Sequence, residues 1–259
     1  MKTTGNTILI TGGGSGIGRG LAEAFHKLGN KVIIAGRRKD VLGQTTSANP
    51  GMSSIPLDID DSAAILAFAK KIVAEHPALN VLINNSGIMR LEDLVNHPED
   101  LSVPEATITT NLLGPIRLTS ALLPHLRKQG DPVVMNVTSS LAFAPLAFAP
   151  VYSATKAALH SWTESLRYQL GKTGTQIIEL VPPYVQTELA GPQQTSDPMA
   201  MPLKDFIAES MQIIQSQPNV VEVLVENAKP QRFAAEGGIE GYNALVNGFN
   251  DAIAKMMSA

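Results

Sequence analysis

Residues 7–18 read T-I-L-I-T-G-G-G-S-G-I-G, in which an apolar run leads into a glycine-rich turn and a helical pattern follows. A strand, such a turn and a helix in this order open many nucleotide-binding α/β folds. Amides at the start of the helix can face a pyrophosphate, which only residues without side chains let approach the backbone. No G-K-[ST] follows, so a nucleoside-triphosphate loop is not expected. The predicted phosphate-binding residues are Gly12, Gly14, Ser15, Gly16, Ile17 and Gly18.

The chain repeats this alternation of short apolar runs and longer amphipathic stretches. Strands are predicted at residues 7–11, 31–35, 53–57, 79–84, 132–138 and 175–181. Helices are predicted at residues 16–28, 61–75, 98–128 and 152–170. Because strands that are apolar throughout need helices on both faces, the pattern indicates an α/β fold with a doubly wound parallel sheet, the Rossmann fold.

Two later segments break the alternation. Residues 182–204 are rich in Pro, Gln, Thr and Met without a clear period, and long loops in compact domains are often functional. We therefore expect a substrate lid at about residues 183–216. Residues 239–257 carry apolar side chains at helical spacing and are predicted to form a helix.

Composition bounds the class of protein. The 259 residues, 44% of them hydrophobic, suffice for one core, so a single domain over residues 1–259 is expected. The 20 basic and 23 acidic residues form no long block of one sign, which excludes a nucleic-acid or anionic-membrane footprint. Cysteine is absent and residue 7 already begins a strand, so a soluble cytoplasmic protein is expected. Five scattered histidines show no metal-ligand spacing, and no metal is assigned.

A second motif, Y-S-A-T-K, occupies residues 152–156. Four residues apart on a helix, Tyr152 and Lys156 share one face. At about 5 Å and an effective dielectric of about 20, the ammonium favours the phenolate by on the order of 3 kcal/mol, which predicts a tyrosine pKa lowered by roughly two units. Tyr168 and Lys172 repeat the spacing, but Tyr168 lies about 160° further round the helix and near its end. We therefore assign the proton transfer to Tyr152.

The glycine spacing T-G-x-x-x-G-x-G and the Y-x-x-x-K pair together make the chain resemble the short-chain dehydrogenase/reductase family. Residues 84–87, N-N-S-G, resemble the N-N-A-G of that family. Asn111, in the helix predicted at 98–128, is similar to its structural asparagine, and Ser139 follows the fifth strand. The resemblance covers about residues 7–187 and does not reach the carboxyl-terminal part.

The resemblance implies an oxidoreductase that transfers a hydride between a nicotinamide cofactor and a carbonyl or alcohol carbon. Tyr152 would be the general acid and base, and Lys156 would bind the nicotinamide ribose and lower the tyrosine pKa. Ser139 would polarise the substrate oxygen, and Asn111 would anchor a water of the proton relay. Ser139 precedes the tyrosine by 13 residues, the spacing usual in the family, and Ser140 by 12, so Ser139 is preferred and Ser140 stays an alternative.

The cofactor is read from the end of the second strand, where Gly36, Arg37 and Arg38 stand in place of an acidic residue that would hold a ribose 2′-hydroxyl. This favours NADP(H), with Arg37 the better-placed donor to the 2′-phosphate, although NAD(H) is possible. The resemblance adds further cofactor contacts, to the adenine and the nicotinamide carboxamide among others. These are Asp58, Asn85, Ser86, Gly87, Tyr152, Lys156, Pro182, Val185 and Thr187. Pro183 replaces the usual glycine, which weakens the assignment of Thr187.

Apolar residues surround the expected substrate position. Residues 141–151 are almost wholly apolar, and Met199, Met201, Leu203 and Phe206 lie in or after the lid. A hydrophobic carbonyl or alcohol substrate is expected, unless these residues pack into the core or a subunit interface.

The helix predicted at residues 239–257 departs from the family, many of whose members end in a further strand used in tetramers. A homodimer through the helices at 98–128 and 152–170 is expected instead. Two other functions are open: a non-catalytic NADP(H)-binding sensor or scaffold protein, and an epimerase or dehydratase acting on a nucleotide sugar. The intact Ser139, Tyr152 and Lys156 argue against the first, and the glycine spacing against the second.

Overall fold

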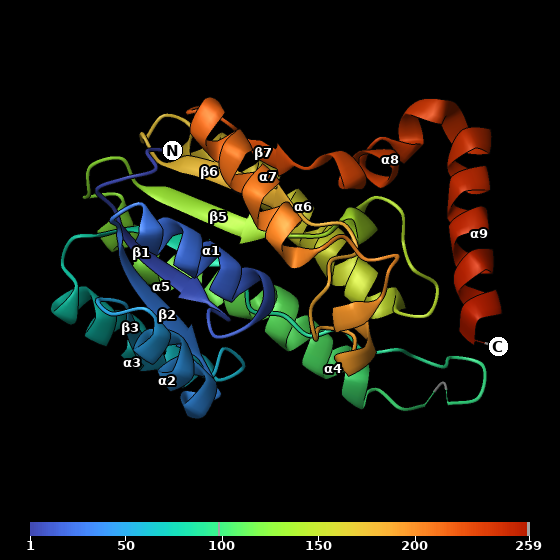
Figure 1. Ribbon diagram of the computed structural model, residues 1–259, viewed down its shortest axis with the longest axis horizontal. Helices are drawn as coiled ribbons and strands as arrows, with labels where there is room; N and C mark the ends of the chain where they lie inside the picture. Colours follow the sequence, from blue (N-terminus) through green and yellow to red (C-terminus); the bar gives the residue numbers. More distant parts are fainter. Residues whose placement is uncertain (98, 258–259) are drawn as a thin grey trace.

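The part of the chain that the structure describes is built on one sheet of seven parallel strands. The computed structural model describes residues 1–97 and 99–257. The strands lie in the order β3-β2-β1-β4-β5-β6-β7 (Figure 1). Their bounds are β1 Thr7–Thr11, β2 Lys31–Gly36, β3 Ser53–Pro56, β4 Leu79–Asn84, β5 Val133–Val137, β6 Gln176–Val181 and β7 Glu222–Leu224. This is the predicted doubly wound α/β fold.

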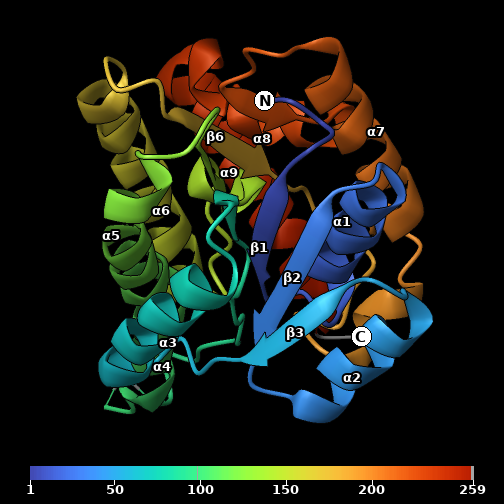
Figure 2. The ribbon, with the colours of Figure 1, turned by 90° about the vertical axis from the view of Figure 1, so that its left-hand side faces the viewer.

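Nine helices connect or follow the described strands. They are α1 Gly16–Lys27, α2 Lys39–Ala48, α3 Ser62–Glu75, α4 Ser102–Ile108, α5 Gly114–Leu126, α6 Pro150–Leu170, α7 Leu203–Ser216, α8 Lys229–Arg232 and α9 Gly238–Met257. A π-helical turn at Thr109–Leu113 joins α4 to α5, and short 3₁₀ turns include Ser140–Ala142 and Pro192–Ser196. Figure 2 shows α1, α2 and α7 on one side of the sheet and α3, α5 and α6 on the other.

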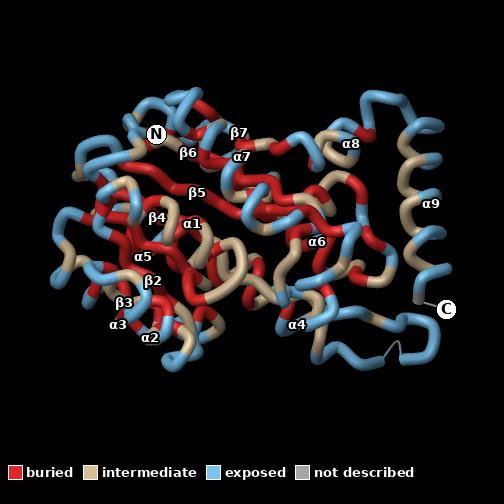
Figure 3. Tube along the Cα trace, in the orientation of Figure 1, coloured by how far each residue is buried: buried red, intermediate tan, exposed pale blue. Residues whose placement is uncertain are grey.

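The apolar strands explain the two layers of helices. Ile8 and Ile10 of β1 pack in one core with Phe25 of α1, whereas Leu9 between them packs in a second core with Ile72 of α3. Successive side chains of a strand point to opposite faces, so a strand without polar residues needs cover on both. Figure 3 shows this buried centre, with exposed helix surfaces around it and a mostly exposed or half-buried α9 at one end.

The prediction of one continuous helix over residues 98–128 is wrong, because two helices and a π-helical turn occupy this range. Its predicted start, Pro98, lies outside the described residues, and helix begins at Ser102. The π-helical turn at Thr109–Leu113 then interrupts it, and α5 ends at Leu126. The side chain of Asn111, in this turn, accepts a hydrogen bond from the amide of Ile88 and donates one to its carbonyl, both at 2.8 Å. The change from α-helical to π-helical hydrogen bonding therefore occurs where Asn111 contacts the loop that follows β4.

The segment predicted to form the lid contains a loop and a helix. Residues 182–202 form an irregular loop with one 3₁₀ turn, but residues 203–216 are helix α7. Phe206 and Ile214 of α7 are fully buried in the core shared with α1. Helix α7 is therefore part of the core, and the loop is attached to the same core through Val185 and Met201. Met201 and Phe206, expected either near substrate or in the core, belong to the core, whereas Met199 is exposed.

Strand β7 and helices α2, α7 and α8 lie outside the predicted strands and helices, and α9 matches the helix predicted at residues 239–257. Among residues 1–97 and 99–257, no helix combines the length and apolar character needed to cross a bilayer. Because β1 lies between β2 and β4, the sheet changes winding direction between β1 and β4, where doubly wound folds bind their ligands.

Candidate active site

The glycine-rich turn after β1 is joined to the loop after β4 by hydrogen bonds. The hydroxyl of Thr11 accepts from the amides of Asn85 and Ser86, at 3.0 and 3.1 Å. The amide side chain of Asn85 donates to the carbonyl of Thr11 at 2.9 Å. A Cβ on Gly18 would lie 2.3 Å from the Gly12 carbonyl oxygen, so no larger residue fits there. The sequence predicted these loops but did not single out Thr11, which ties them together.

A cavity of about 440 Å³ opens at this junction. Predicted cofactor residues that line it are Gly12, Gly14, Ser15, Gly16, Ile17, Arg37, Arg38, Asn85, Ser86, Gly87 and Thr187. The side chain of Ser15 caps none of the first amides of α1, so these amides keep donors for an anion. A nucleotide pyrophosphate fits this turn. Predicted cofactor residues outside the lining are Gly18, Asp58, Tyr152, Lys156, Pro182 and Val185.

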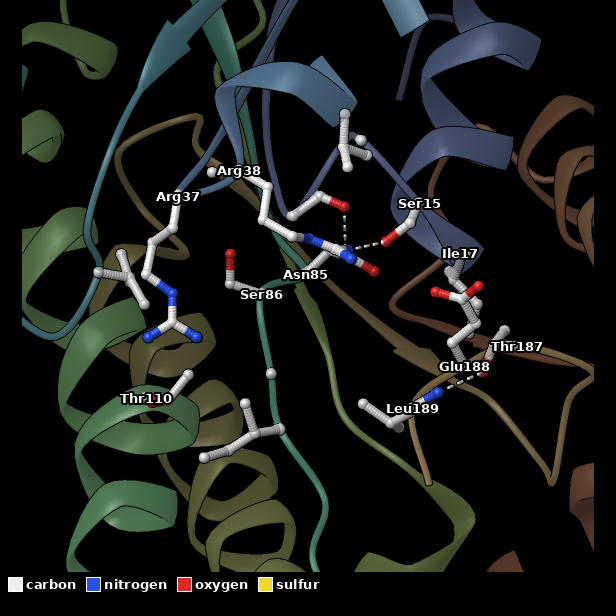
Figure 4. Close-up of a pocket in the computed structure, with 18 of the residues that line it drawn as sticks. Ser15, Ile17, Arg37, Arg38, Asn85, Ser86, Thr110, Thr187, Glu188 and Leu189 are labelled. Carbon is white, nitrogen blue, oxygen red and sulfur yellow. Dashed lines mark hydrogen bonds between the residues drawn. The ribbon is translucent and has the colours of Figure 1, made fainter. Parts of the chain in front are cut away.

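The two arginines after β2 lie in different surroundings. Arg38 donates to the hydroxyl of Ser15 at 2.9 Å and so reaches across the glycine-rich turn (Figure 4). Arg37 extends the other way and donates at 3.1 Å to Asp60, which also accepts from the hydroxyl of Thr110 at 2.6 Å. Asp60 therefore neutralises part of the charge of Arg37, whereas Arg38 contacts only a neutral hydroxyl at the turn.

The remaining predicted cofactor contacts lie after β3 and in the loop after β6. Asp58 is exposed after β3 and accepts from the amide of Asp60 at 3.1 Å. The carbonyl of Val185 accepts from the side chain of Gln194, and that of Pro182 accepts from the amide of Ser140. Thr187 lines the cavity, and its hydroxyl accepts from Gln194 at 3.2 Å.

Ser139, Tyr152 and Lys156 converge at the carboxyl end of β5. Tyr152 lies in the first turn of α6, is 5% exposed and is hydrogen bonded to Ser139. The ammonium of Lys156, one turn later, donates to the Val137 carbonyl at 2.8 Å and lies 5.6 Å from the centre of the tyrosine ring. Ser140 points its amide at the Pro182 carbonyl, and no described hydrogen bond joins it to the tyrosine. Ser139 is thus the serine whose side chain interacts with the tyrosine hydroxyl and affects its pKa.

The pKa of Tyr152 differs from the sequence prediction. Burial raises it to about 12, and the hydrogen bond to Ser139 only partly opposes this. Burial also lowers the pKa of Lys156 to about 8. The prediction assumed a fully charged ammonium beside a solvated phenol, but both groups are buried, which disfavours phenolate and ammonium alike. The tyrosine is therefore a protonated acid at neutral pH.

Asn111 lies beside this cluster. Its amide is 3.4 Å from the hydroxyl of Thr155 in α6, and a Cβ on Gly87 would lie 3.3 Å from its side-chain oxygen. The amide also bonds both backbone groups of Ile88, as described above. Single π-helical turns inside α-helices recur at functional sites, and here the turn sets this asparagine between the loop after β4 and α6.

Residues that the sequence did not reveal hold the cluster from outside. The carboxylate of Glu92 accepts from the amide of Val151 at 3.0 Å and so caps the start of α6. Behind the site, the buried carboxylate of Glu179 accepts from the hydroxyl of Thr138 at 2.7 Å and pairs with His160 at 2.8 Å. No local sequence motif predicts the roles of these residues, because their partners lie 19 to 59 positions away in the sequence.

The chain is similar in sequence to known proteins. A family model for short chain dehydrogenases matches residues 6–198. A curated relative, an uncharacterized oxidoreductase DltE of Bacillus subtilis, is 38% identical over 252 residues, covering 97% of this chain and 93% of the relative.

Solved structures share the fold. A short chain dehydrogenase of Burkholderia cenocepacia in complex with NADP superposes with a TM-score of 0.81 at 22% identity, over 95% of this chain and 99% of that one. A 3-ketoacyl-(acyl-carrier-protein) reductase of Brucella melitensis complexed with NADH superposes with a TM-score of 0.77 at 25% identity, over 88% and 100%.

Proposed function

The chain belongs to the short-chain dehydrogenase/reductase family, and we propose that it is an NADP(H)-dependent oxidoreductase acting on the carbonyl or alcohol group of a small, hydrophobic molecule. One observation carries this proposal. A buried tyrosine hydrogen bonded to Ser139 lies beside a buried lysine, at the same edge of the sheet as a glycine-rich nucleotide cradle. Nucleotide and proton donor can therefore meet one substrate.

Each residue of the site has its own role in the proposed reaction. When bound, NADP(H) supplies or accepts the hydride at the substrate carbon. In reduction, Tyr152 donates its proton to the carbonyl oxygen while Ser139 holds that oxygen by a hydrogen bond, and in oxidation Tyr152 takes the proton back. Lys156 binds the nicotinamide ribose, and Asn111 anchors the water that returns a proton from solvent. A tyrosine that stays protonated at neutral pH suits the reducing direction.

The preference for NADP(H) rests on the arginines. In place of Arg37, which the sequence favoured, we assign the main 2′-phosphate contact to Arg38, because Asp60 already pairs with Arg37. Arg38 lies over the glycine-rich turn and hydrogen bonds Ser15, so both can donate to a 2′-phosphate, while Arg37 adds a second positive charge. The Burkholderia relative holds NADP and the Brucella relative NADH, so the fold alone accepts either cofactor.

A titration with NADPH and NADH tests the cofactor assignment, followed by changes in cofactor fluorescence. We expect Arg38→Ala to weaken NADPH binding by roughly tenfold or more, since a hydrogen bond to a charged group contributes about 1.5 to 3 kcal/mol, and to leave NADH binding unchanged. Arg37→Ala should have a smaller effect because Asp60 already pairs with it. Equal loss for both nucleotides would contradict the 2′-phosphate contact.

A second candidate is a non-catalytic NADP(H)-binding sensor or scaffold protein. One observation favours it: Ser139 and Tyr152 are buried and line neither described cavity of this structure. Assays of hydrophobic aldehydes and ketones with NADPH separate the two functions. Turnover supports the oxidoreductase, whereas tight NADPH binding without turnover of any carbonyl would favour the sensor.

The assembly and location proposed for this enzyme are a homodimer in the cytoplasm. The dimer would form through α4, α5 and α6, and the absence of cysteine suits a reducing compartment. Sedimentation equilibrium gives the mass directly, and a monomer or tetramer would refute the assembly.

A further inference from the structure

Helix α9 is hydrogen bonded to the segment that connects Ser139 to Tyr152. The side-chain oxygen of Asn250 accepts from the amide of Ala147 at 2.7 Å, and its side-chain nitrogen donates to the carbonyl of Pro145 at 3.1 Å. One amide thus satisfies a donor and an acceptor of the same short loop. These bonds cross more than 100 residues of sequence, so they fix where the loop lies relative to a distant helix.

The same helix contributes to the apolar surroundings of the catalytic tyrosine. Leu146, Ala149 and Tyr152 form a small buried cluster, separate from the two cores of the sheet. Phe249 and Ile253 of α9 pack against this cluster, and they share one face of the helix because they are four residues apart. The other side of α9 is exposed, and Figure 1 shows the helix at the edge of the molecule. The inner face of α9 therefore contacts the cluster that contains Tyr152 and the loop before it.

Met89 links this cluster to the open part of the site. Its side chain packs against the cluster, and the residue also lines both the cofactor cavity and a neighbouring cavity of about 360 Å³. A substrate whose carbonyl oxygen reaches Tyr152 therefore has Met89 and the face of α9 as its apolar neighbours.

We infer that α9 is the outer wall of the substrate site, with Phe249 and Ile253 as specificity-determining residues for the apolar part of a carbonyl or alcohol substrate. Asn250 is a positioning residue that holds the loop at residues 145–147 against this wall. The inference rests on the proposed function and deepens it, because it names the surface that limits the size of the substrate.

Steady-state kinetics with NADPH and straight-chain aldehydes from propanal to decanal test the wall. Phe249→Ala and Ile253→Ala remove apolar volume, so each should shift the ratio of kcat/KM between long and short aldehydes about tenfold, with the Kd for NADPH unchanged. Met256→Ala, on an exposed part of the same helix, is the control and should leave the ratio unchanged. Phe249→Leu keeps most of the volume and covers the case in which the alanine variant does not fold. A uniform fall for every aldehyde, or an unchanged ratio, would overturn the specificity assignment.

Hydrogen exchange tests the positioning role without any need for turnover. Asn250→Ala should speed exchange of the Ala147 amide at least about tenfold, because its acceptor is lost. Asn247→Ala, the same change at an exposed position of α9, should not. Equal exchange in both variants would overturn the role of Asn250. If the wild type reduces none of these aldehydes, the specificity assignment fails, whereas the proposed function fails only if ketones and alcohols are not turned over either. The exchange measurement decides the contact of Asn250 in every case.

Discussion

The spacing Y-x-x-x-K occurs at the start of helix α6 and again across its end, and the two pairs have different surroundings. Tyr152, at the start of the helix, is 5% exposed, whereas Tyr168, near its end, is 91% exposed. Lys156 is buried and donates to the Val137 carbonyl, while Lys172 is exposed beyond the last turn. The same Tyr-Lys spacing therefore forms a candidate active site at one end of the helix and a solvated surface at the other.

The difference comes from what faces each pair. The first turn of α6 meets the carboxyl end of β5, where Ser139 lies, and is capped by Glu92 from the loop after β4. At the last turn Leu170 still packs in the core beside Ile177 of β6, but Tyr168 is exposed to solvent. The Tyr-Lys spacing therefore forms a candidate active site only where the sheet edge buries the pair and places the Ser139 hydroxyl and the Val137 carbonyl beside it. Substitutions at the two pairs and at their neighbours test this comparison.

The largest expected effect separates the two tyrosines. Tyr152→Phe removes the proton donor and should lower kcat for carbonyl reduction by about 10³-fold, the usual range of general acid catalysis, with NADPH binding retained. Tyr168→Phe should leave kcat unchanged. Steady-state assays with cofactor titrations measure both. If Tyr152→Phe keeps more than about a tenth of the activity, Tyr152 is not the acid.

The two lysines give the next effect. Lys156→Met should lower kcat/KM by roughly 10²-fold, since a hydrogen bond from a charged donor contributes about 1.5 to 3 kcal/mol. Burial lowers the pKa of Lys156 to about 8, so the wild-type Kd for NADPH should rise as pH increases through about 8. That pH dependence should vanish in Lys156→Met and persist in Lys172→Met. An unchanged profile in Lys156→Met would show that this ammonium does not hold the cofactor.

A smaller effect is expected at His160, which lies between the two pairs on α6. The hydrogen bond to Glu179 raises the pKa of His160 above 6.5, against its burial, and Glu164 adds attraction while Arg232 opposes it. The stability gained from this pair is therefore fully present below pH 6.5 and is lost as pH rises through the raised pKa of the folded protein.

Two matched variants test that pair. Glu179→Gln should lower the free energy of unfolding at pH 6 by about 2 kcal/mol, because its carboxylate is 1% exposed and hydrogen bonded, and should flatten the pH dependence. Glu164→Gln changes an exposed carboxylate 3.9 Å from the same imidazole and should cost at most about 0.5 kcal/mol. Urea denaturation between pH 5.5 and 9 gives both numbers. Equal losses would mean that burial of Glu179 contributes nothing.

The smallest effect concerns the cap of the first turn of α6. Glu92→Ala should lower the free energy of unfolding by about 1 kcal/mol, the usual loss for a helix cap. Because the cap lies next to Tyr152, kcat should fall as well, by a few fold. Glu99→Ala, at an exposed position of the same connection, is the control. A stability change without any change in kcat would limit Glu92 to a structural role.

Much of the fold follows from patterns that are short in sequence. Strands β1, β2, β4 and β6 begin and end within a residue or so of their predicted bounds, because apolar runs between turn residues are local signals. Strand β7 has only three residues, and α2 has a weak apolar face, so neither stands out. Helix α7 has apolar residues at helical spacing, among them Phe206, Met211 and Ile214, but it lies within the predicted lid, and its burial against α1 could not be inferred from that segment alone.

The candidate site divides in the same way. The sequence by itself determined the glycine-rich turn, the Y-x-x-x-K pair and the serine after β5, since each depends on residues within a few positions of one another. Only the tertiary structure decided which of the two tyrosines is buried, that its pKa is raised instead of lowered, and that Glu92 and Asn250 hold its loop. The physical reason is that burial and hydrogen bonds across 50 to 100 residues depend on which elements the fold brings together.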